Sequence, residues 1–98
     1  MSTELPGGVS AYKRTPTFTE VSVPRGLLDD HSTKEGVWGL IHVEEGRLLY
    51  IVTDPRRSFA DRILAPGGAP GVVEPTITHR VEPLGPVRFY VQFLRSLA

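Results

Sequence analysis

Proline and glycine recur along almost the whole chain, and this punctuation constrains the fold more than any other feature. The 98 residues include nine prolines and ten glycines. Proline removes a backbone hydrogen-bond donor, and glycine raises the entropic cost of ordering the chain, so long helices are disfavoured. Short extended segments separated by turns remain possible. The sequence therefore predicts an all-β protein.

Alternation of apolar side chains marks the expected strands. It is clearest from Val87 to Leu94, where valine and phenylalanine occupy every second position. Val37–Val43 alternates in the same way and is followed by Glu-Glu-Gly and by Arg47–Val52, a pattern that predicts a β-hairpin. Thr78–Val81 predicts a further strand, joined to Val87–Leu94 by a turn with the sequence EPLGP.

The intervening segment, residues 53–70, is expected to be a connection with a helical turn or a short strand at Phe59–Leu64. The run Ala65–Gly71 is rich in glycine, but no Lys-Ser/Thr pair follows it, so it is not a phosphate-binding loop. Six or more short strands with frequent turns are typical of a sandwich or a small barrel. Residues 1–10 are expected to form a flexible leader and residues 11–98 a single domain.

Charge and cysteine content exclude several classes of function. Eleven basic and eleven acidic side chains cancel, so no positive excess favours nucleic-acid binding. The absence of cysteine excludes disulfides and thiolate metal sites and is consistent with the reducing cytosol. No apolar run approaches the roughly 20 residues that span a bilayer, and residues 1–10 do not resemble a signal peptide. A cytoplasmic protein without membrane or nucleic-acid partners is expected.

Two histidines, His31 and His79, stand at junctions between a loop and a predicted strand, where functional side chains are often displayed. At the mouth of a small barrel they could converge on one ligand. With a carboxylate, Glu82 or secondly Glu35, they would form a set suited to zinc, iron, nickel or manganese. In a regular strand Glu82 would point away from His79, although the adjacent Pro83 makes irregularity plausible. Both segments also read as simple solvated loops.

Three further residues are candidates for ligand contacts. Lys34 could donate to an anionic ligand, or it could be an exposed turn charge of little energetic consequence. Trp38 and Tyr90 could line a pocket, although large aromatic residues on a sheet more often belong to a core or an interface. His42 lies opposite the Gly39, Ile41 face in the alternation, so we interpret it as a surface histidine.

The two histidine segments resemble the TehB/YeaR-like, cupin-like domain family associated with tellurite resistance proteins. The resemblance covers most of the chain outside the leader and residues 53–70. Its motifs are H-x-T-K-x-G-x-W-G, V-x-x-G-x-L and P-x-x-x-H-x-V-E. They are carried here by His31, Thr33, Lys34, Gly36, Trp38, Gly39, Val43, Gly46, Leu48, Pro75, His79, Val81 and Glu82.

This resemblance implies a small cupin-like β-barrel of the jelly-roll type, with His31 and His79 as site residues. Gly39 stands where the general cupin signature has a metal-binding glutamate. A metal would therefore have incomplete protein coordination, completed by water or ligand. In some family members the domain precedes a methyltransferase that handles tellurite. No glycine-rich cofactor loop occurs here, so that activity is not transferred.

Three hypotheses follow. The leading one is a stand-alone domain that binds a small anion or metabolite, with a divalent metal at His31 and His79 as one means of binding. The second is a metal-dependent cupin enzyme, of the oxygenase or isomerase type, with Glu82 as acid or base. The third is a homodimeric interaction module without small-molecule activity.

Overall fold

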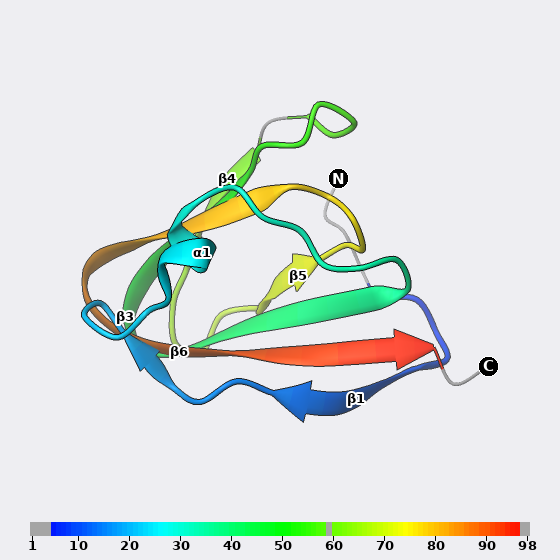
Figure 1. Cartoon of the computed structure of the whole chain (residues 1–98). Helices are drawn as coiled ribbons and strands as arrows, with labels where there is room; N and C mark the ends of the chain where they lie inside the picture. The colour runs from blue at the N-terminus through cyan, green and yellow to red at the C-terminus, as the bar shows by residue number, and fades with distance from the viewer. Residues whose placement is uncertain (1–4, 59, 97–98) are drawn as a thin grey trace.

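The computed structural model describes residues 5–58 and 60–96 and is built mostly of antiparallel β-strands (Figure 1). The elements, in chain order, are β1 (Val9–Arg14), β2 (Phe18–Thr19), α1 (Arg25–Leu28), β3 (Val37–Val52), β4 (Ala60–Leu64), β5 (Gly71–Val73) and β6 (His79–Ser96). The all-β prediction is confirmed. In the described part of the chain, no helix is both long and apolar enough to cross a membrane.

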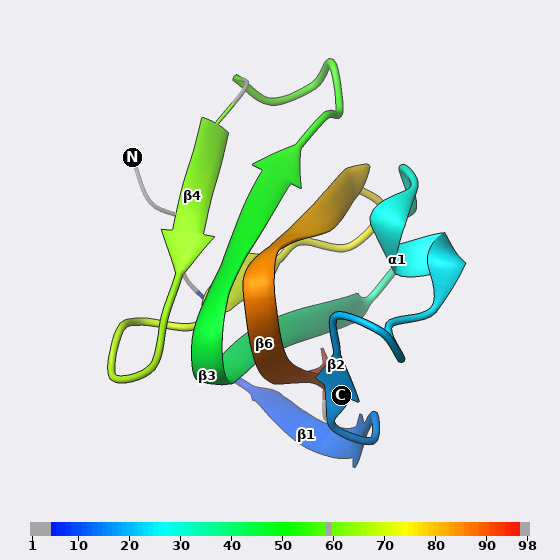
Figure 2. The same cartoon turned by 90° about the vertical axis from the view of Figure 1, so that its left-hand side faces the viewer.

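Two long, bent strands, β3 and β6, organise the molecule. They pair with each other over their full length, from Val37 opposite Arg95 to Val52 opposite His79. Figure 2 shows them side by side through the bend. The predicted hairpin within residues 37–52 is therefore wrong, because both halves of this segment belong to β3 and pair with β6. The predicted turn EPLGP likewise lies inside β6.

The bend of β3 explains why the sequence pattern around Gly46 resembles that of a hairpin. Register shifts occur in β3 between Val43 and Glu45 and again between Gly46 and Leu48, so the chain bulges rather than reverses. Gly46 has a φ of 76°, and a Cβ atom there would lie 2.0 Å from the carbonyl oxygen of Pro86. A hairpin turn and a β-bulge both use glycine at positive φ. Gly46 is thus compatible with either, and pairing with β6 decides between them.

The sheet has the strand order β1-β6-β3-β4, with β2 also paired to β6 and β5 also paired to β3. Within residues 5–58 and 60–96, no pairing of β1 with β4 closes this path, so the expected jelly-roll barrel is not confirmed. The sheet instead folds over on itself. Figure 1 shows the first half of β6 above and its second half below, with the interior between them.

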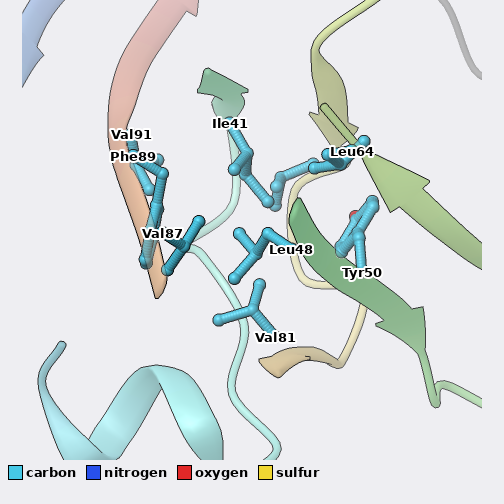
Figure 3. Close-up of a cluster of buried hydrophobic side chains, with 9 residues drawn as sticks. Ile41, Leu48, Tyr50, Leu64, Val81, Val87, Phe89 and Val91 are labelled. Atoms are coloured by element: carbon cyan, nitrogen blue, oxygen red, sulfur yellow. The ribbon is translucent and has the colours of Figure 1, made fainter. Parts of the chain in front are cut away.

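The apolar core lies in this interior (Figure 3). Leu48 and Phe89 are completely buried, and Leu48 lies next to the bend of β3. Burying a side chain of this size stabilises a fold by about 1.5–3 kcal/mol. The buried cluster comprises Ile41, Leu48, Tyr50, Leu64, Val73, Val81, Val87, Phe89 and Val91.

The ends and connections differ in detail from expectation. Strand β1 begins at Val9, inside the ten residues expected to form a leader, and residues 1–4 of that segment lie outside the described residues. The expected element at Phe59–Leu64 is the strand β4, and Phe59 itself lies outside the described residues. The residues after Pro24 form the short helix α1, from which Leu27 packs against the core.

Candidate ligand pocket

Two backbone hydrogen bonds join His31 to His79, the first residue of β6. The amide of each residue donates to the carbonyl oxygen of the other, and both N···O distances are 2.9 Å. Residues paired in this way in an antiparallel ladder project their side chains to the same face. The imidazole rings accordingly lie 4.2 Å apart between centroids, with their planes at 58°. The structure therefore brings together two histidines that are far apart in the sequence.

A main-chain carbonyl orients each of the two rings. The Nδ1 of His31 lies 2.9 Å from the carbonyl oxygen of Asp29, and the Nδ1 of His79 lies 3.0 Å from that of Ile77. A carbonyl oxygen can only accept, so a neutral ring in either position carries its proton on Nδ1. Each Nε2 then keeps a lone pair, and neither Nε2 has a hydrogen-bond partner in the described part of the chain.

His79 is held in its neutral form. The residue is only 3% exposed, and Tyr50 packs edge-on against its ring with centroids 5.6 Å apart. Burial, with a smaller contribution from the nearby His31, lowers the pKa of His79 to about 4. The hydrogen bond to Ile77 and the charge of Asp30 oppose this shift. His79 is therefore neutral near pH 7, with Nε2 available as an acceptor or a metal ligand.

The histidine pair faces a cavity of about 350 Å³ inside the folded sheet. This volume falls at the small end of the roughly 300–1,000 Å³ that is typical of ligand sites. The wall contains side chains from both halves of the sheet, from α1 and from the loop that carries His31. The wall residues are Tyr12, Lys13, Thr15, Leu27, His31, Ser32, Thr33, Lys34, Val37, Gly39, Ile41, Val73, His79, Val81, Phe89, Val91 and Phe93.

The predicted ligand contacts divide between the two faces of the sheet. Lys34 lines the cavity together with the histidine pair. Trp38 and Tyr90 do not, because they alternate with the cavity-lining residues of β3 and β6 and face the other side. On that side the ring of Tyr90 stacks on His42, with centroids 4.8 Å apart, and Arg14 lies 3.7 Å above it.

The predicted carboxylate ligands are not brought to the histidine pair. Glu82 is exposed on the outer face of β6, where its nearest cation is Arg80 at 3.6 Å. Glu35 is exposed and does not line the cavity. Among residues 5–58 and 60–96, no three histidine, cysteine or acidic side chains are grouped as metal ligands. Of the predicted metal ligands His31, His79 and Glu82, only the two histidines therefore lie together.

Sequence reasoning overlooked the buried Asp54, which supports the segment leading into His79. Asp54 is 3% exposed; its carboxylate accepts a hydrogen bond from the amide of Thr78 at 3.0 Å and is bound by the guanidinium of Arg56. Arg56 also donates to the carbonyl oxygen of Thr76 at 2.6 Å. These contacts, chiefly those from Arg56, hold the pKa of Asp54 well below its usual range. The dipeptide Asp54-Pro55, which begins two residues after the end of β3 at Val52, was the available signal, since Asp-Pro favours turn initiation.

Solved structures show the same fold. The crystal structure of TehB from Haemophilus influenzae superposes with a TM-score of 0.83 at 28% sequence identity, covering 92% of this chain. The chain spans only 32% of that protein's length. A protein from Escherichia coli strain K12, a Northeast Structural Genomics Consortium target, matches with a TM-score of 0.84 at 19% identity. That match covers 98% of this chain and 99% of the other. No curated protein sequence matches significantly.

The family resemblance noted in the sequence is confirmed. A family model for the TehB-like domain matches residues 13–91. This range includes His31, Lys34 and His79, and all the cavity wall except Tyr12 and Phe93. The chain therefore belongs to the TehB-like domain family, which is related to tellurite resistance proteins.

Proposed function

We propose that this chain is a cupin-like binding domain for a small anion or metabolite, held in the cavity that His31, His79 and Lys34 line. One observation carries the proposal: two imidazoles, each oriented by a carbonyl, meet 4.2 Å apart at the wall of a ligand-sized cavity. Fixed polar groups in a mostly apolar concavity are the usual arrangement of small-molecule sites.

The imidazoles and the lysine of the cavity would recognise different parts of the ligand. Neutral imidazole offers its Nε2 lone pair to a hydroxyl donor, and the Lys34 ammonium attracts negative charge. An oxyanion that keeps a proton near neutral pH, such as hydrogen phosphate or hydrogen tellurite, presents both an O–H donor and a charged oxygen. The relation to tellurite resistance proteins makes tellurite the first oxyanion to test.

The test compares variants that remove histidines from opposite faces of the sheet. The double variant His31→Ala, His79→Ala removes both pocket acceptors, whereas His42→Ala removes a histidine from the outer face. We expect the double variant to bind tellurite or phosphate at least about tenfold more weakly, since a hydrogen bond to a charged group contributes about 1.5–3 kcal/mol. His42→Ala should bind as the parent does. Equal affinities for all three folded proteins in calorimetric titration would refute the proposal.

A divalent metal held by the same two histidines is a second candidate. The observation that favours it is the pair of Nδ1 contacts to carbonyl oxygens, because metal-ligating histidines commonly donate their other N–H in this way. Zinc, iron, nickel and manganese accept imidazole ligands. With two protein ligands, the remaining positions would go to water or to the bound ligand.

Metal binding has its own readout. Addition of Zn²⁺ should shift the NMR signals of the His31 and His79 rings and leave those of the outward His42 in place. Manganese should broaden the same two rings selectively. Uniform shifts of all three histidines, or none at millimolar metal, would exclude this candidate and leave the metal-free binding proposal standing.

A further inference from the structure

The interior of the cavity is apolar well beyond the histidine pair. Ile41, Val73, Val81, Phe89 and Val91 contribute its inner wall, and all five belong to the buried core cluster. A bare oxyanion placed against this inner wall, away from the histidine pair and Lys34, would lose its hydration without replacement hydrogen bonds, which is costly. An apolar group would gain from the same surroundings.

The charge of the wall has one sign. Lys13 of β1 and Lys34 of the loop before β3 line the cavity, and no aspartate or glutamate of residues 5–58 and 60–96 does. Neither lysine forms an ion pair with a carboxylate in the described part of the chain. The hydroxyls of Thr15 and Thr33 both donate to backbone carbonyls, at 2.8 and 2.6 Å, and are not free to donate to a ligand.

Together these features favour a ligand with an apolar body and a negatively charged end. We propose that the cavity takes a small apolar monocarboxylate, its hydrocarbon part among the core side chains and its carboxylate at Lys13 and Lys34. The inference rests on the proposed binding function and specifies the ligand class. The volume of about 350 Å³ is roughly that of twelve liquid water molecules, which leaves room for about ten non-hydrogen atoms. Octanoate has this size.

The experiment varies the tail and the head of the ligand separately, using the whole chain and two-dimensional amide NMR. Acetate, butanoate, hexanoate and octanoate test the tail. Each added CH₂ should strengthen binding about fourfold, because burying one contributes about 0.8 kcal/mol. Octanol and octylammonium test the head and should bind at least tenfold more weakly than octanoate. The amides of Val81, Phe89 and Val91 should report the bound tail.

Matched variants test the role of the two lysines. The double variant Lys13→Gln, Lys34→Gln removes both positive charges of the cavity wall, each at an exposed position. The control Arg88→Gln removes an exposed positive charge that does not line the cavity. The double variant should lose at least tenfold in octanoate affinity while its octanol affinity is unchanged. Arg88→Gln should match the parent protein for both ligands.

Three results would overturn this inference. The first is an affinity that does not rise from acetate to octanoate. The second is an affinity for octylammonium equal to that for octanoate. The third is the absence of NMR shifts at the amides of Val81, Phe89 and Val91 when octanoate is saturating. Titration with tellurite or phosphate on the same samples reports independently on the proposed function. Oxyanion binding that requires the histidines, without binding of octanoate, would leave that function intact and exclude the ligand class.

Discussion

A buried histidine with a free Nε2 is the residue-scale feature that most distinguishes this domain. The surroundings of His79 disfavour its charged form, because the ring is almost fully buried and His31 lies beside it. Such a ring makes a dependable acceptor near neutral pH, which a solvent-exposed histidine does not. The feature that suits His79 to binding therefore also makes the fold sensitive to acid.

The first prediction is a loss of stability between about pH 6.5 and about pH 4 that depends on His79. The pKa of this histidine is about 4 in the folded chain against an ordinary value of 6.5, so the unfolded chain binds a proton that the folded chain does not. The contribution of neutral His79 to the free energy of unfolding is fully present above pH 6.5. It is lost as the pH falls from about 6.5 to about 4. The loss approaches about 3 kcal/mol. Urea unfolding at a series of pH values measures it.

The control for this prediction is His79→Gln, which cannot titrate in that window. It should be less stable than the parent near neutral pH. Its free energy of unfolding should also fall less steeply than that of the parent between about pH 6.5 and about pH 4. His42→Ala should retain the slope of the parent, because His42 lies on the other face. Identical slopes in the parent and His79→Gln would show that His79 is already protonated or exposed in the folded protein.

The bend of β3 against β6 is the decisive feature at the scale of the element. Without the register shifts around Gly46, the two strands would run straight and could not fold over a cavity. A glycine is needed at this position for two reasons: its φ is positive, and the Pro86 carbonyl oxygen occupies the space that a Cβ would fill. Bulges commonly serve to bend a strand in this way.

The second prediction is that Gly46→Ala destabilises the fold more than the same change at Gly36. Gly46 and Gly36 both have positive φ, 76° and 80°, but a Cβ at Gly36 would meet no atom of the described residues within 4 Å. Alanine in this conformation costs about 1–2 kcal/mol. Gly36→Ala should lose about that much and Gly46→Ala distinctly more, measured by thermal and chemical unfolding. Equal losses would mean that the clash with Pro86 is relieved by backbone movement.

The whole molecule is one core shared by the two layers of a folded sheet. The buried cluster takes residues from the first and second halves of both long strands, as Ile41 and Leu48 of β3 and Val81 and Phe89 of β6 illustrate in Figure 3. Most contacts that hold the layers together therefore join residues far apart in the chain. We expect the two layers to unfold together rather than one after the other.

The third prediction concerns Leu48→Ala, a change in the core outside the cavity wall. Leu48 is completely buried, and replacing such a leucine with alanine costs about 2–5 kcal/mol. This is a large share of the roughly 5–15 kcal/mol that stabilises a typical domain. Ile63→Ala, at a position on β4 that is 53% exposed, should cost far less. Hydrogen exchange should accelerate in both layers of Leu48→Ala; acceleration in one layer alone would contradict a shared core.

Local patterns in the sequence already determined the all-β class, the position of most strands and the outward direction of His42. Alternation and the placement of proline and glycine act within a few residues, so they can be recognised without a partner strand. The same alternation places Trp38 on the face of His42 and Glu82 opposite His79, and both residues do lie outside the cavity. Strict use of the alternation rule would have excluded Trp38 and Glu82 as residues of the site.

Only the tertiary structure decided that residues 37–52 continue through Gly46 as one strand, and that His31 meets His79. Both depend on which strand pairs with which, and pairing is a long-range choice among segments with similar apolar patterns. The sequence determined what each segment could become. The packing of the folded sheet around a common core determined which of these possibilities was realised.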